Sequence, residues 1–203
     1  MTETTARRDE ILAAAAVLFA RKGIKSTTVR EIGDAVGVLS GSLYYHFDSK
    51  EAMAREILMD FLTAIQKRYA TVLTGATDAA DGLRRLVHAS LQLAREKPHA
   101  TALYQNELHY LRENPRFSDV QEAAADVQRT WLDLIERGVA EGSLRADIPP
   151  RVFHRLVRDA VWLSSRSLRT DREYPAERLA RDITSIVLHG FAAASSQAGQ
   201  VAH

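Results

Sequence analysis

The 203-residue sequence contains no cysteine and only five prolines. The lack of cysteine excludes disulfide bridges, thiolate metal sites and a cysteine nucleophile, and it fits a reducing compartment. The sequence contains no run of about 18 apolar residues, the length needed to cross a bilayer. The polar start MTETTARRDE does not resemble a signal peptide. We therefore expect a soluble cytoplasmic protein with no membrane partner.

An excess of charge of one sign is also missing, because 27 lysines and arginines face 26 aspartates and glutamates. No uniform field draws the whole protein onto a polyanion, so nucleic-acid binding would need a local surface. The seven histidines form no His-x-x-x-His pair, so no metal site is expected. The sequence motifs of common hydrolases and nucleotide-binding enzymes are absent as well, and we expect neither a cofactor nor catalysis.

What the sequence does contain is hydrophobic residues, 46% of the total, at helical spacing almost throughout. No sustained alternation of β-branched residues indicates a strand. The fold class is therefore predicted to be all-α with about nine helices, divided into an N-terminal three-helix unit, 1–50, and a C-terminal helical bundle, 51–203. After a first helix that ends at Gly23, helices are predicted at 28–36, 41–47, 50–73, 80–96, 99–112, 117–142, 149–169 and 175–194.

Local signals define the ends of the N-terminal helices. Thr28 and Glu31 have the spacing of a capping box. Ser40 and Ser49 are the predicted N-caps of the two helices that follow. The lengths of these helices, with a turn at Gly37, are typical of a helix-turn-helix. The alternative is an ordinary helical hairpin with a solvated polar face, and spacing alone does not decide between the two.

Three segments resemble the DNA-binding domain of the TetR family of bacterial repressors: TTVREI at 27–32, GVLSGSLYYHF at 37–47 and SKEAM at 49–53. The resemblance implies a homodimer in which the last two helices of each subunit form a four-helix interface. It also implies a helix-turn-helix that binds a double-stranded DNA operator and a ligand pocket enclosed by the middle helices. Leu39 stands where polar residues are common in the family, which leaves base readout at that position open. The DNA contacts implied by position are Thr28, Arg30, Ser40, Ser42, Tyr44, Tyr45, His46 and, on a phosphate, Lys50.

Segments 38–44, 104–107, 114–118 and 158–166 further resemble the KstR-type repressors of cholesterol catabolism. The best-matching branch controls breakdown of the last two steroid rings and responds to a CoA thioester of the ring remnant. The resemblance therefore implies a small-molecule inducer that is an acyl-CoA. The ligand contacts expected first are Trp162 and Arg166, and the further candidates are Arg158, Tyr104 and Glu107.

The residues of the predicted helix 149–169 allow an independent interpretation. Spacings of three and four place one tryptophan and four arginines on one side of it. An indole packs on an apolar body while guanidinium groups bind phosphates, so this side suits a ligand with both parts. The alternative is a solvated or salt-bridged face, with the tryptophan at an interface, and the sequence leaves this open. The five residues are Arg155, Arg158, Trp162, Arg166 and Arg169.

These observations predict a ligand-controlled transcriptional repressor that binds an inverted-repeat operator as a homodimer. The ligand would favour a dimer with a different separation of the two DNA-binding units. A repressor that responds to a fatty acyl-CoA or to an exported drug is an alternative. An acyl-CoA-handling enzyme and a constitutive architectural DNA-binding protein are the remaining alternatives.

Overall fold

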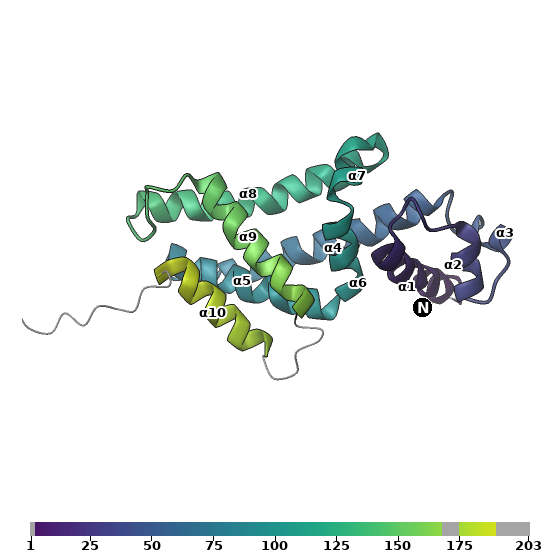
Figure 1. Cartoon of the computed structure of the whole chain (residues 1–203), viewed down its shortest axis with the longest axis horizontal. Coiled ribbons are helices and arrows are strands. Elements are labelled where there is room, and N and C mark those ends of the chain that lie inside the picture. The colour runs from purple at the N-terminus through teal and green to yellow at the C-terminus, as the bar shows by residue number, and fades with distance from the viewer. Residues whose placement is uncertain (1–2, 168–174, 190–203) are drawn as a thin grey trace, which may run out of the picture.

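The computed structural model describes residues 3–167 and 175–189, and within these ranges the chain is helical without any strand (Figure 1). This confirms the predicted all-α class. Three N-terminal helices gather at one end of an elongated molecule: α1 (Glu3–Lys22), α2 (Val29–Ala35) and α3 (Ser40–Leu43). We call them the reading head.

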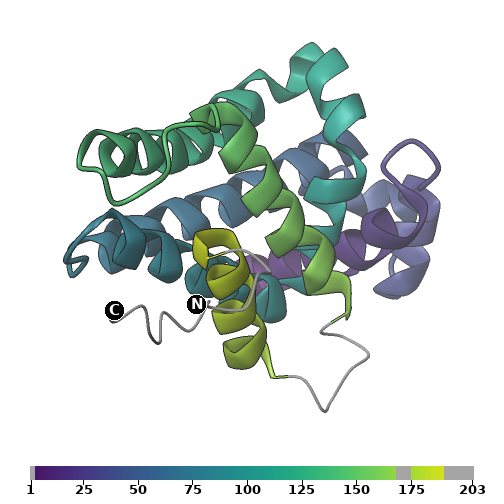
Figure 2. The ribbon, with the colours of Figure 1, turned by 60° about the vertical axis from the view of Figure 1, so that its left-hand side comes forward.

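The long helix α4 (Lys50–Leu73) joins the reading head to the bundle and packs against α1, α5, α6 and α8. The most enclosed bundle helix is α5 (Ala79–Glu96), which contacts α4, α8, α9 and α10. The bundle continues with α8 (Ser118–Ala140) and α9 (Pro150–Ser167), and α10 (Ala176–His189) covers α5 from outside (Figure 2). None of the helices in the described ranges is long and apolar enough to cross a membrane.

Three predicted helix ends are confirmed by their hydrogen bonds. The Thr28 hydroxyl accepts from the Glu31 N–H at 3.2 Å, and the Glu31 carboxylate accepts from the Thr28 N–H at 2.9 Å, which completes the capping box. Ser49 accepts from the N–H of Ala52 at 3.1 Å and begins α4. Gly23 follows α1 with a φ of +84°, the left-handed conformation of a helix C-cap.

Two predicted helices differ from the structure. The helix expected at 41–47 is α-helical only to Leu43, and its N-cap is Leu39, so the prediction that Ser40 caps it was wrong. Residues 44–46 continue as tight turns, with hydrogen bonds from Tyr45 N–H to Ser42 C=O and from His46 N–H to Leu43 C=O. The main-chain course therefore remains helical in character although the regular helix has ended.

The helix expected at 99–112 is two helices, α6 (Pro98–Asn106) and α7 (Leu108–Glu113). Glu107 separates them with φ −103° and ψ 9°, outside the helical region. No proline or glycine marks this break in the sequence, because tertiary packing bends the chain there. A short 3-10 helix, η1 (Pro115–Phe117), leads into α8, and the described residues hold ten α-helices where about nine were expected.

A single hydrophobic core runs from the reading head through the bundle. Its members extend from Ile11 of α1, through Phe61 of α4 and Leu86 of α5, to Ile183 of α10. The boundary expected near residue 50 therefore lies inside a continuous helix and a continuous core. The bundle is joined to the reading head through α4 and through α6, both of which pack on α1.

Candidate DNA-binding surface and ligand cavity

The reading head holds α2 and α3 together by a close approach of their backbones. Ile32 and Leu43 are fully buried between the helices. A Cβ added at Gly33 would lie 2.8 Å from the carbonyl oxygen of Val38, so this position requires glycine. Gly37 allows the turn with a φ of +69°, as the sequence predicted. The need for Gly33 was missed, although a glycine inside a capped helix is the signal of such an approach.

The face of α3 and of the turns after it carries exposed side chains. Tyr45 is 93% exposed and Tyr44 57% exposed, although tyrosine is usually at least half-buried. Ser40 and Ser42 are exposed beside them, and His46 is half-buried. Five of the residues expected to contact DNA therefore lie on one surface at the end of the molecule.

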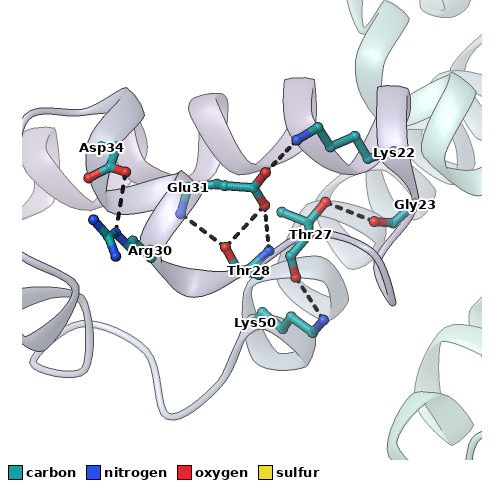
Figure 3. A network of polar contacts seen from close by, with 8 residues as sticks. All are labelled: Lys22, Gly23, Thr27, Thr28, Arg30, Glu31, Asp34 and Lys50. Atoms are coloured by element: carbon teal, nitrogen blue, oxygen red, sulfur yellow. Dashed lines mark hydrogen bonds and ion pairs between the residues drawn. The ribbon is translucent and has the colours of Figure 1, made fainter.

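The first turn of α2 holds a network of polar contacts (Figure 3). The Thr28 hydroxyl donates to the Glu31 carboxylate at 3.0 Å, and Glu31 pairs with Lys22 of α1. The Lys22 ammonium and the hydrogen bonds from Thr28 lower the pKa of Glu31 to about 2, so it is charged at neutral pH. Thr28 is thus engaged within α2, while Arg30 is exposed and meets Asp34 only at 3.9 Å.

Lys50 ties the loop before α2 to the first turn of α4. Its ammonium donates to the carbonyl oxygen of Thr27 at 2.7 Å (Figure 3). It also donates to the carbonyl oxygen of Lys25 at 2.9 Å. An ammonium carries three donor hydrogens, so one is left for an outside acceptor. A shallow cleft there is lined by Lys50, Thr28 and Tyr44, which the sequence separates by up to 22 positions. The structure therefore brings three of the expected DNA contacts together.

A second feature is a cavity of about 410 Å³ inside the bundle, enclosed by α4, α6, α7, α8 and α9. This volume lies within the range of small-molecule sites. Two arginines, one histidine and two tryptophans stand among its apolar walls. The apolar side chains that line it include Phe61, Leu62, Ile65, Leu108, Leu111, Val120 and Val127.

The cavity includes some of the expected ligand residues and not others. Trp162, Arg158 and Tyr104 line it, with the Trp162 ring 6.1 Å and the Tyr104 ring 5.8 Å from that of Phe61. Glu107 does not line it, because its carboxylate points to α1, where a Cβ at Gly23 would lie 2.6 Å from it. This removes the geometric support for Glu107 as a ligand contact.

The other arginines of α9 do not add to the cavity wall that the structure describes. Arg155 is exposed and lies outside the cavity lining. The side chain of Arg166 and the whole of Arg169 lie outside the described residues. Of these four arginines, Arg158 is therefore the one that the structure places at the cavity.

Two arginines, one aspartate and one neutral imidazole define the electrostatics of the cavity. Arg158 donates two hydrogen bonds to one oxygen of Asp159, at 2.8 and 2.9 Å, and Arg112 is exposed at the cavity's edge. Burial, and then the charge of Arg158, lower the pKa of His154 to about 4, so this imidazole is neutral at pH 7. Burial raises the pKa of the Tyr104 phenol. Because Asp159 also lines the cavity and offsets the charge of its partner Arg158, the cavity near pH 7 keeps an excess of one positive charge, contributed by Arg112.

The sequence interpretation missed Arg112 and His154 as cavity residues. They come from α7 and α9, and no local pattern relates residues 42 positions apart. In the structure Trp131 is both buried and part of the cavity lining.

A chain of hydrogen bonds connects three helices at the base of the cavity. The Trp131 indole N–H of α8 donates to the Tyr69 hydroxyl of α4 at 3.2 Å. The Tyr69 hydroxyl lies 2.5 Å from the Ser90 hydroxyl of α5, which donates to the carbonyl oxygen of Leu86 at 2.7 Å. Because Ser90 donates its proton to Leu86, Tyr69 donates to Ser90 and accepts from Trp131. Burial raises the pKa of Tyr69, which stays protonated.

We expect Tyr69→Phe to lower the free energy of unfolding by about 1–3 kcal/mol, because it leaves the buried Trp131 N–H without an acceptor. Urea denaturation followed by tryptophan fluorescence measures this loss. Tyr104→Phe is the matched control, since no hydrogen bond of the Tyr104 hydroxyl is found among the described residues, and it should change stability far less. Equal losses of unfolding free energy in the two variants would contradict the hydrogen-bond chain from Trp131 through Tyr69 to Ser90.

Comparison with known proteins places both features in a family context. Residues 11–57 match the family described as bacterial regulatory proteins, tetR family, and residues 76–191 match the tetracyclin repressor-like C-terminal domain. The chain is 38% identical over 189 residues to the HTH-type transcriptional repressor KstR2 of Mycolicibacterium smegmatis, covering 93% of this chain and 92% of the relative. It is 40% identical over 186 residues to the KstR2 repressor of Rhodococcus jostii, covering 92% and 91%.

Solved structures are similar as well. The ketosteroid transcriptional regulator KstR2 of Mycobacterium tuberculosis superposes with a TM-score of 0.83 at 35% identity. That match covers 91% of this chain and 94% of the other. This chain is thus similar to these relatives, both in sequence and in structure, over nearly its whole length.

Proposed function

This chain belongs to the TetR family and is a transcriptional repressor rather than an enzyme, and from this premise we propose that it is a homodimer released from an inverted-repeat operator by an acyl-CoA thioester. The observation that carries the ligand part of the proposal is the cavity, where apolar walls meet Trp162, Arg158 and Arg112. As an operator-binding protein it would act beside the chromosome, in the bacterial cytoplasm.

The reading head supports the DNA part of the proposal. A major groove admits a helix whose leading residues are small and whose neighbours donate hydrogen bonds. Ser40 and Ser42 are small, and Tyr44 and Tyr45 carry exposed hydroxyls. Arg30 and Lys50 provide cations for the phosphates on either side. We propose that residues 1–50 form the unit that binds one operator half-site.

Exposed apolar residues on the last two helices support a dimer. Leu156 of α9 is 58% exposed and Ile186 of α10 is 39% exposed, and the two helices pack against each other at the surface (Figure 2). Burying such side chains against a second copy would be favourable. We propose that α9 and α10 of two subunits form a four-helix interface, which gives the two reading heads the symmetry of an inverted repeat.

The cavity supports a ligand with an apolar body and an anionic part. A volume of about 410 Å³ accommodates an acyl group but not the whole of an acyl-CoA. We propose that the acyl group occupies the apolar interior against Trp162, and that CoA phosphates lie towards Arg158 and Arg112. Because curated relatives are named as KstR2 repressors and one solved relative as a ketosteroid regulator, we propose an acyl group that derives from steroid rings.

Contacts on both faces of α6 and α7 provide a route from the cavity to the reading head. Tyr104 and Leu108 line the cavity. On the other face, the Asn106 side chain donates to the carbonyl oxygen of Ala20 at 3.4 Å, and the Lys25 ammonium lies 5.0 Å from the centre of the Tyr110 ring. A ligand that moves the wall formed by α6 and α7 would therefore move α1. Such a shift transmits a signal only if the ligand binds the two arrangements with different affinity.

The purified protein tests the proposal directly. Selection from random duplexes should recover an inverted repeat, and native mass spectrometry should show a dimer on it. A CoA thioester of a steroid-ring fragment should release that DNA, whereas free CoA and the free acid should not. Release by a fatty acyl-CoA instead would overturn the steroid assignment, and release by none of the thioesters would overturn the acyl-CoA assignment. Recovery of no preferred sequence would overturn operator binding.

A further inference from the structure

Leu39 is an exposed apolar side chain at the start of α3, the helix that leads to the exposed Tyr44 and Tyr45. It is 82% exposed, although leucine is among the residues most often buried. Leu43, one helical turn later, is completely buried in the core of the reading head. The two tyrosines of this surface have hydroxyl groups for phosphates or base edges, whereas Leu39 has no polar atom in its side chain. Its exposure leaves it available to an apolar partner outside the chain.

The backbone places Leu39 at the leading end of α3. It is the N-cap residue, with φ −65° and ψ 140°, and its side chain makes no capping hydrogen bond. The three residues that follow, Ser40, Gly41 and Ser42, have small side chains. A Cβ added at Gly41 would meet no atom within 4 Å, so the surface beside Leu39 is open. Leu39 is thus the largest apolar group where a groove would meet the start of α3.

The major groove of DNA offers one kind of apolar group along its base edges, the C5-methyl of thymine. The other groups there are hydrogen-bond donors and acceptors, and a leucine side chain can pair with none of them. Phosphates are excluded as partners for the same reason. Resting on the proposed operator binding, we propose that Leu39 is a specificity-determining residue that selects a thymine by contact with its C5-methyl group.

This contact occurs once in each half-site, because the proposed dimer presents two symmetry-related reading heads. Removal of one buried methyl group is expected to weaken binding about fourfold. Loss of both symmetry-related methyl groups should weaken it about 15-fold, since well-separated positions contribute almost additively. Deoxyuridine pairs as thymidine does and lacks only this methyl group, so it isolates the contact.

The test uses the full-length protein and the duplex that it selects from a random pool. Each thymine of one half-site is replaced in turn by deoxyuridine, and dissociation constants are measured by fluorescence anisotropy. We expect one position at which wild-type binding falls about fourfold. Leu39→Ala should bind the original duplex more weakly and lose the sensitivity at that position. Its unfolding midpoint should be unchanged, because the side chain lies outside the core.

Tyr45→Ala is the matched control, since it removes an exposed neighbour and should keep the deoxyuridine effect while lowering affinity overall. The inference is overturned if no deoxyuridine changes wild-type affinity, or if Leu39→Ala retains the same sensitivity. It is also overturned if Leu39→Ala changes only the number of dimers bound to the duplex, which would make Leu39 a contact between proteins. These results differ from failure of operator binding, in which the random pool yields no preferred duplex.

Discussion

Trp162→Ala should leave operator affinity unchanged and raise the acyl-CoA concentration needed for release about 10- to 150-fold. This factor corresponds to the loss of about 1.5–3 kcal/mol from burying an aromatic side chain against the ligand. Trp162 lines the cavity with its ring 6.1 Å from that of Phe61, and its helix α9 packs against α5, α8 and α10 of the bundle. Anisotropy of a labelled operator, titrated with the CoA thioester, measures the shift.

The matched control for this variant is Arg155→Met, which removes a cation two turns earlier on the same helix. Because Arg155 is exposed and does not line the cavity, its loss should not change the response. Arg158→Met should weaken the response as Trp162→Ala does, since Arg158 lies at the cavity. A normal response of both cavity variants would show that the inducer binds elsewhere. Equal defects in Arg155→Met and Arg158→Met would indicate that the arginines act through long-range charge alone.

Tyr45→Ala should weaken operator binding by about tenfold or more, as the loss of one contact to the operator predicts. The side chain is 93% exposed, so its removal should leave stability and CoA-thioester binding as in the wild type. Because tyrosine is neutral, the slope of log affinity against log salt concentration should stay the same. Gel-shift titrations at two salt concentrations measure both quantities.

Lys50→Met is the corresponding variant at a positively charged residue of the same surface. Loss of one phosphate contact should reduce the salt slope by about 1. It also removes the hydrogen bonds to the carbonyl oxygens of Lys25 and Thr27, so a modest loss of stability should accompany it. Unchanged affinity in both Tyr45→Ala and Lys50→Met would contradict the proposed DNA-binding surface. A reduced salt slope in Tyr45→Ala alone would contradict the assignment of the phosphate contact to Lys50.

Features that depend on local interactions were predicted well from the sequence. The capping box of Thr28 and Glu31, the cap at Ser49 and the glycine turn at Gly37 each involve residues within one turn of each other. Their geometry follows from backbone hydrogen bonding and from the conformational freedom of glycine. The apolar periodicity likewise predicted the long helices to within a few residues of their ends, because one face of each must be buried.

Features that depend on contacts between distant segments were not accessible in this way. The break at Glu107 has no local signal and follows from packing of α6 on α1. Glu107 follows Tyr104 by three residues, a spacing that would place both on the same face of a continuous helix. Only Tyr104 lines the cavity, because the bend directs Glu107 towards Gly23. Arg112 and His154 line one cavity from two different helices, and no spacing rule relates their positions.

Helical class, helix caps and family membership were thus already present in the order of the amino acids, because short-range hydrogen bonding and periodic burial encode them. Which side chains share a cavity, and which basic residues remain available to a ligand, depended on how the helices cross. The same long-range packing lowers the pKa of His154 to about 4 and aligns Trp131, Tyr69 and Ser90 into one hydrogen-bond chain. These properties arise from desolvation and from the meeting of distant helices, which only the folded chain brings about.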